Sequence, residues 1–413
     1  MNDTRNVEIG SNHRNVQLDF LRGVAILMVV VHHTILFRVP SGWQLPVIRC
    51  GWAGVDLFFV LSGFLISGLL FSEYRRRGKI GFWRFAARRA LKIYPAFYVL
   101  VLLTIVIRIG SDRHDLVPTL RAFLHDVFFI QSYFPGTYGH FWSLSIEEHF
   151  YILLPLTLYF MLRRSRPNEE DPFRFLPWLF AIVAITELIA RLLTARWIPF
   201  TLLTHLTATH LRIDSLLFGV LLSYWANFHG ERFWRLVLAK YPFILAVGVL
   251  LISPTLVLPN DNRWMYTYGF TVLYLGFGAI MLSLLALPVA SLSKVAQSLF
   301  RAIAYIGGFS YSIYLWHVPW VKVLQKYNVV HIRYFGVFVY ITGAIVIGII
   351  TAKLVEIPVL RLRERLLPTH RQGAAARLTA TSVTPAQADG LSTASVHNPK
   401  ELYHSRNERG GIF

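Results

Sequence analysis

The stretch QLDFLRGVAILMVVVHHT, residues 17–34, decides the fold, because it is an apolar run of membrane-spanning length with charges inside it. Burying an ionisable group in lipid is costly, so such charges mark a functional site by default. At about 100° per residue, Arg22 and His33 fall within roughly 20° of each other on one helix face. Asp19 precedes Arg22 by one helical turn on that face. The stretch therefore predicts a membrane helix whose polar stripe faces the interior of a helix bundle.

The stripe separates its two basic groups along the helix axis by roughly 16 Å. Two simpler interpretations stand beside the functional one. Arg22 lies near the start of the span, where a long cationic side chain can snorkel to the interface. One of His32 and His33 could be an ordinary polar residue near the end of the span.

The composition of the whole chain indicates a polytopic membrane protein. Of its 413 residues, 55% are hydrophobic and only 15% are charged, against about 25% charged in soluble domains. The net charge of +19 comes from clusters between apolar runs, which favours positive cytoplasmic loops over nucleic-acid binding. The first span is too long and too charged at its start for a cleaved signal peptide. The single cysteine, Cys50, excludes an internal disulfide.

Apolar windows of about 20 residues predict an all-α bundle of about ten transmembrane helices. The short apolar segment 116–130 predicts a re-entrant or interfacial helix. Lysine and arginine are richest in the loops 72–92, 163–175, 228–240 and 288–304, which predicts that both termini face the cytoplasm. We expect a cytoplasmic segment at 1–16, a membrane domain at 17–358 and a largely disordered cytoplasmic tail at 359–413. The ten windows are 18–37, 51–71, 93–109, 143–162, 176–194, 209–227, 241–258, 267–287, 305–324 and 334–355.

Further polar residues occur inside or beside these spans. Helix packing explains the small pair Ser62-Gly63, but it does not explain the intramembrane carboxylate Asp56. Arg88, Arg89 and Lys92 form a basic run before the third span, which could hold phosphates or simply anchor the cytoplasmic side.

The later spans carry acids and imidazoles as well. Helix-dipole capping accounts for one of two adjacent glutamates at the start of the fourth span, but not for both. Two oppositely charged residues in the sixth span could simply pair with each other. No zinc-ligand spacing, Walker loop or dinucleotide fingerprint is present, so we expect no bound metal or cofactor. These candidate residues are Ser145, Glu147, Glu148, Arg212, Asp214 and His317.

Several motifs, taken in order, resemble the acyltransferase 3 family of integral membrane acyltransferases over most of residues 17–358. They are LDFLRG at 18–23 with His33 eleven positions after Arg22, GVDLFF at 54–59, the basic run before IYP at 93–95, WSLS at 142–145 with EE at 147–148, Arg212-x-Asp214, and SYS at 310–312 with His317. Lys92 stands where the family usually has arginine, and His149 where glutamine is common. Many members append an extracytoplasmic hydrolase-like domain, and we expect none after the membrane domain here.

The resemblance implies O-acylation, usually O-acetylation, of cell-envelope or exported glycans, with cytoplasmic acyl-CoA as co-substrate. The acceptor would be a glycan or glycolipid such as lipopolysaccharide O-antigen or an exopolysaccharide, and the site would lie in the inner (plasma) membrane. The family's spacing selects His33 over His32 as the essential histidine. It also implies importance for Arg22, the basic run and the glutamate region.

These residues suggest a mechanism. Arg88, Arg89 and Lys92 would bind the donor phosphates, while His33 would act as general base or briefly carry the acyl group. Asp19 and Arg22 would pair, and Glu147 or Glu148 would orient or protonate the imidazole. Asp56, Ser145, Arg212, Asp214 and His317 would line the cavity. The alternatives are acylation of a small cytoplasmic acceptor and secondary transport.

Overall fold

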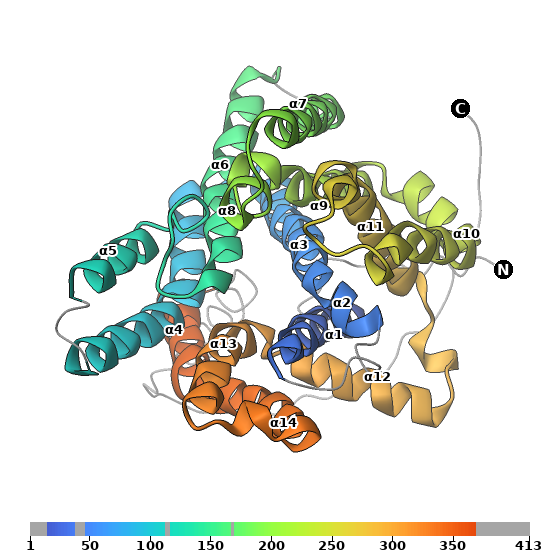
Figure 1. The fold of residues 1–413 in the computed structure, drawn as a ribbon. Coiled ribbons are helices and arrows are strands. Elements are labelled where there is room, and N and C mark those ends of the chain that lie inside the picture. The colour runs from blue at the N-terminus through green and yellow to red at the C-terminus, as the bar shows by residue number, and fades with distance from the viewer. Residues whose placement is uncertain (1–14, 38–45, 112–115, 167–168, 369–413) are drawn as a thin grey trace, which may run out of the picture. The chain divides into compact units, whose positions relative to one another are not determined.

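The computed structural model describes residues 15–37, 46–111, 116–166 and 169–368, which are mostly helical with no strand among them. This confirms the all-α prediction. The α-helices run in chain order around and across one bundle (Figure 1). They are α1 Val16–His32, α2 Pro46–Cys50, α3 Gly54–Arg77, α4 Phe82–Ser111, α5 Leu116–Val127, α6 Trp142–Arg164, α7 Leu176–Trp197, α8 Leu202–His205, α9 Ile213–Phe228, α10 Gly230–Ile252, α11 Phe270–Ala286, α12 Lys294–Gly307, α13 Ser310–Lys326, α14 Arg333–Thr351 and α15 Ile357–Leu366.

Each of the ten predicted windows falls on a helix. Within the described part of the chain, seven helices are long and apolar enough to cross a membrane. The windows at 143–162, 209–227 and 305–324 fall on α6, α9 and α13, of which α9 is apolar but shorter than a typical span. The count of ten and the cytoplasmic placement of both termini stay predictions.

Two element boundaries differ from the sequence prediction. Gly78 ends α3 with a left-handed backbone, φ 66°, and the chain re-enters a helix at Phe82. The basic run before the third span therefore lies on α4 rather than in a loop. At the other end the helix continues through a π-helical turn, Ala352–Glu356, to Leu366. The first eight residues of the predicted tail are thus helical, while 1–14 and 369–413 lie outside the described residues.

Helix α7 shows how the bundle meets the membrane. Four large apolar side chains, Ile182, Ile185, Ile189 and Leu193, recur at helical spacing and are each more than half exposed. The charged residues Glu187 and Arg191 are instead buried in the protein. In water this pattern would be inverted, so α7 presents its apolar face to lipid and its charges to the interior.

Helix α3 lies at the centre of the bundle and is buried on most sides (Figure 1). It packs against α9 through Gly63 and Gly219. A Cβ on Gly63 would lie 1.9 Å from the Leu216 carbonyl oxygen, so the two backbones are in direct contact. Small residues permit this close helix packing in membranes.

Candidate functional site

Three histidines from three elements lie together beside the end of α1. His33 directly follows α1, His317 lies in α13, and His140 lies in the turn before α6. The ring centroid of His317 is 4.8 Å from that of His33 and 4.9 Å from that of His140. His317 is fully buried and His140 nearly so. The structure therefore brings together His33 and His317, which the sequence selected, and adds His140, which it did not.

Main-chain carbonyls fix the tautomers of two of these rings. His33 Nδ1 lies 2.9 Å from the Val29 carbonyl oxygen, and His317 Nδ1 lies 2.6 Å from that of Tyr314. A carbonyl oxygen only accepts, so each Nδ1 carries the proton and each Nε2 keeps its lone pair. The Val29 carbonyl oxygen thus holds the His33 ring, and the Nε2 lone pair is left available.

The neighbouring His32 has a different task. Its Nδ1 donates to the carbonyl oxygen of Ile48 at 3.0 Å, which ties the end of α1 to α2. The structure therefore separates the two histidines, with His33 in the imidazole group and His32 holding a neighbouring helix.

Tyr314 organises the other side of the histidine group. Its hydroxyl donates to the His140 carbonyl oxygen at 2.7 Å, and its own carbonyl oxygen accepts from His317. The hydroxyl proton of Tyr314 is used in this way, so Ser143 Oγ, 2.6 Å away, donates to the Tyr314 oxygen. Tyr314 and Ser143 are functional candidates that the sequence reasoning quoted within motifs but did not single out.

A cluster of basic side chains forms further along the bundle. Asp19 and Arg22 pair, as their spacing predicts, with 3.4 Å between Oδ1 and Nη1. Arg89 and Lys92 of α4 lie within electrostatic range of Arg22. Arg88 points elsewhere and pairs with Glu364 of α15 at 2.8 Å. Two of the three predicted phosphate ligands therefore join Arg22, and the third binds the last described helix.

The two adjacent glutamates of α6 accept from tyrosines. Tyr151 donates to Glu147 Oε2 at 2.6 Å, and Tyr94 donates to Glu148 Oε2 at 3.1 Å. Glu147 also lies within electrostatic range of Arg22, Arg89 and Lys92. It is thus associated with the basic cluster, while the proposed role of either glutamate toward the imidazole stays a prediction.

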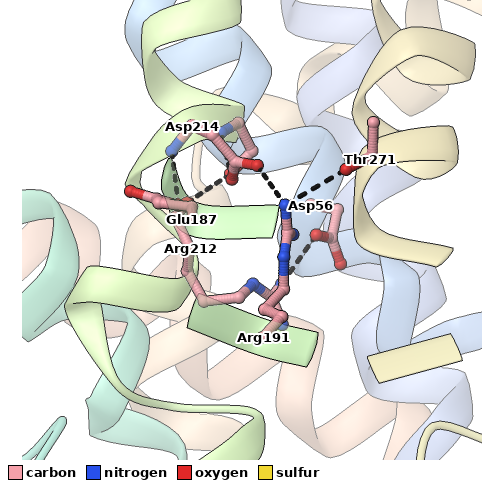
Figure 2. Close-up of polar contacts among 7 residues, drawn as sticks. Asp56, Glu187, Arg191, Arg212, Asp214 and Thr271 are labelled. Carbon is pink, nitrogen blue, oxygen red and sulfur yellow. Dashed lines mark hydrogen bonds and ion pairs between the residues drawn. The ribbon is translucent and has the colours of Figure 1, made fainter. Parts of the chain in front are cut away.

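A second buried network joins four helices (Figure 2). Arg212, which precedes α9, donates to Asp56 Oδ1 of α3 at 2.6 Å, and its guanidinium lies 3.6 Å from the ring centroid of Phe270. Arg191 of α7 donates to Asp214 Oδ2 at 2.6 Å and to Thr271 at 3.1 Å. Every charged side chain in these pairs is at most 3% exposed.

The alternative that Arg212 and Asp214 simply pair with each other does not hold, since each pairs with a different helix. Arg212 precedes α9 with a non-helical backbone and reaches Asp56 of α3, while Asp214 in the first turn of α9 reaches Arg191 of α7. The sequence reasoning also missed Glu187, whose Oε2 accepts from the Asp214 amide at 3.1 Å. A visible signal existed, since Glu187 and Arg191 stand one turn apart inside an apolar window.

Ser145 holds a neighbouring turn. Its Oγ donates to the carbonyl oxygen of Phe129 and lies 3.1 Å from Ser132 Oγ. Phe129 has a left-handed backbone, φ 53°, which is uncommon for a bulky residue and needs support from its surroundings. Ser132 is also hydrogen-bonded to Thr209, and Thr209 Oγ1 lies 2.9 Å from His149 Nδ1. The geometry gives Ser145 a structural task beside its predicted place in the cavity.

Comparisons with known proteins show what the chain is similar to. The family model Acyl_transf_3, described as an acyltransferase domain, matches residues 15–354. O-acetyltransferase OatA of Staphylococcus aureus strain NCTC 8325 is 26% identical over 328 residues, covering 76% of this chain and 51% of the relative. A protein of S. aureus strain COL named "Putative O-acetyltransferase SACOL0978" is 27% identical over 360 residues, covering 83% and 56%. The chain thus spans about half the length of these relatives. No solved structure gave a significant match.

Proposed function

We propose that this chain, which belongs to the membrane acyltransferase family Acyl_transf_3, moves an acetyl group from acyl-CoA to a hydroxyl of a cell-envelope or exported glycan. The names of the relatives support O-acetyl transfer. The apolar helices and the inward-facing charges support action within a membrane, which we take to be the inner (plasma) membrane.

The observation that carries the proposal is the state of His33. Its Nδ1 is committed to the Val29 carbonyl oxygen, which leaves the Nε2 lone pair available. In the simplest route, Nε2 takes the proton of the acceptor hydroxyl while the hydroxyl oxygen attacks the thioester carbonyl carbon. The carbon–sulfur bond then breaks, and the CoA thiolate takes its proton from the imidazolium. A route through an acyl-histidine uses the same atom of His33.

The donor would be held at the opposite end of α1. Arg22, Arg89 and Lys92 from two helices supply the positive charge that suits the phosphates of acyl-CoA. Lysine meets a phosphate as a point charge, without the two-pronged geometry of arginine. The separation of this cluster from His33 along α1 suits a donor that enters from one side and an acceptor that enters from the other.

Replacing either of two adjacent histidines with glutamine tests the catalytic role of His33. Membranes containing the His33→Gln variant should transfer labelled acetyl from acetyl-CoA at least 100-fold more slowly than wild type, the usual size of a general-base contribution. His32→Gln is the matched control, since its amide can still donate to Ile48, and it should stay within a few-fold of wild type. Wild-type transfer by a folded His33→Gln protein would remove His33 from the mechanism.

The acceptor class needs a separate measurement. Mass spectrometry of envelope glycans from cells with and without the protein should show acetyl groups that depend on the chain. Acetylation confined to a small cytoplasmic molecule would reject the glycan acceptor. Substrate flux without covalent transfer would favour a transporter.

A further inference from the structure

Two arginines from different helices meet on one carboxylate at the end of the described chain. Arg88 of α4 places Nη2 2.8 Å from Glu364 Oε1 and Nη1 3.4 Å from Oε2. Arg363 of α15 places Nη2 2.6 Å and Nε 3.1 Å from the same Oε1. Arg88 also donates to the Leu367 carbonyl oxygen. Guanidinium groups arranged around one anionic oxygen form the geometry that proteins use to bind phosphate.

Further positive charge surrounds this pair. Arg363 lies within electrostatic range of both Arg89 and Lys92, as Arg22 does. Among the described residues, Arg89 and Lys92 have no carboxylate within 4 Å. Arg89 instead faces the rings of Phe85 and Tyr151. The site at Glu364 therefore lies within electrostatic range of Arg89 and Lys92 through Arg363, while the nearest acids of these two groups, Glu147 and Glu356, lie beyond ion-pair distance.

The carboxylate of Glu364 is held between the two arginines weakly enough for another anion to replace it. The side chains of Arg88, Arg363 and Glu364 are 21%, 18% and 30% exposed. Ion pairs with this access to solvent contribute little to stability. A phosphate group offers more acceptor oxygens and more negative charge than a carboxylate, so it can displace Glu364 from both arginines.

We propose that Arg363 completes the phosphate site of the acyl donor, and that Glu364 occupies this site until the donor phosphate replaces it. The inference rests on the proposed use of acyl-CoA and adds a regulatory contact to it. Under this proposal, helix α15 supplies one ligand of the donor phosphate, Arg363, and one anion that competes with that phosphate, Glu364. Helix α15 lies beyond residue 354, where the family match ends.

Binding of CoA and dephospho-CoA to the purified full chain in detergent tests the proposal without requiring transfer. Arg363→Ala should weaken CoA binding about tenfold or more, the usual cost of a charge-assisted hydrogen bond, and Arg363→Lys should recover part of it. Glu364→Gln should tighten CoA binding several-fold, because the neutral amide competes less well. A larger loss for CoA than for dephospho-CoA in Arg363→Ala would assign the 3′-phosphate, and equal losses would assign the pyrophosphate.

A control substitution on the same helix distinguishes a specific CoA-binding site from general attraction of CoA to positive charge. Arg365→Ala removes the same charge from an exposed position of α15 and should leave CoA affinity within twofold. An equal loss in Arg365→Ala and Arg363→Ala would overturn the site. Unchanged or weaker CoA binding by Glu364→Gln would overturn the competing role of Glu364. If wild type binds no CoA, the donor in the proposed function fails first; if it binds CoA and Arg363→Ala matches it, only the present inference fails.

Discussion

Arg212 is held by one ion pair, a hydrogen bond to the Leu206 carbonyl oxygen and nearby aromatic rings, and it is shielded from solvent. Its partner Asp56 is 1% exposed, and the alanine substitution Asp56→Ala would leave a guanidinium buried without its counter-charge. Loss of one partner from such a pair costs about 3–5 kcal/mol. We expect Asp56→Ala to lower the unfolding temperature in detergent strongly. The exposed pair of Glu231 and Arg235 gives the control, since Glu231→Ala should change it little. Equal effects of the two substitutions would contradict this account.

Asp126 lies on α5, outside the seven candidate spans, and should make the stability of the fold depend on pH. Burial raises its pKa to about 6, although the Thr137 amide donates to Oδ2 at 2.9 Å. The folded state therefore binds more protons than the unfolded chain between about pH 4 and pH 6. Stability contributed by the protonated form is present below this window and is lost as pH rises through it.

The substitution Asp126→Asn keeps an acceptor for Thr137 and removes the titration. We expect the variant to lose the decline in stability between pH 4 and pH 6, and to be more stable than wild type at pH 7.5 by up to roughly 3 kcal/mol. Thermal unfolding at pH 4.5, 6 and 7.5 checks this. An unchanged pH slope in the variant would show that another group titrates.

Sequence reasoning at the residue scale succeeded where the partners were local. Asp19 and Arg22 are one turn apart, so their pairing follows from helix geometry. The partner of Arg212 lies 156 positions away on another helix, and helix periodicity carries no information on which faces meet. The same limit hid the contact of His140 with His317.

Close packing of α3 against α9 sets the register of the charge network. Asp56 lies on α3 and Arg212 precedes α9, so their 2.6 Å contact depends on the distance between these helices. Gly63→Ala would place a methyl group 1.9 Å from the Leu216 carbonyl oxygen and push the helices apart.

We expect Gly63→Ala to cost at least about 1–3 kcal/mol, the range for overpacking, and to reduce acetyl transfer in the remaining folded protein. Gly68→Ala on the same helix is the control, because its added carbon would approach Ser223 Oγ only to 3.4 Å. Unfolding in detergent and transfer assays on both variants provide the measurement. If both behave as wild type, the contact at Gly63 does not set the register.

The elements themselves were largely predictable, because the bilayer sets the length of an apolar helix. Helix α4 was the main exception. Residues 82–92 contain three arginines and one lysine, so hydropathy predicts a loop there, yet they form the first part of α4. Hydropathy measures the free energy of moving a side chain into lipid, so it carries no information on where a helix begins.

At the scale of the molecule, the orientation of the protein in the membrane can be tested with engineered cysteines. In a Cys50→Ser background, Asp261→Cys places a thiol in an exposed loop predicted to face outward, and Lys79→Cys places one in an exposed loop predicted to face the cytoplasm. In right-side-out vesicles, an impermeant maleimide should label the first variant directly and the second only after permeabilisation. The reverse pattern would contradict the predicted cytoplasmic N-terminus.

Helix α1 carries Arg22 and is followed directly by His33, so this one helix sets the distance between the proposed donor site and the proposed base. Substitutions cannot alter that distance, because rise and rotation belong to the backbone. Inserting one residue would add about 1.5 Å and turn His33 by about 100° away from its face. Seven inserted residues would nearly restore the phase but add about 10 Å. In the proposed mechanism, the distance from the donor site to the base and the direction of the His33 ring are therefore coupled, and both can be kept in phase only by changes of whole helical turns.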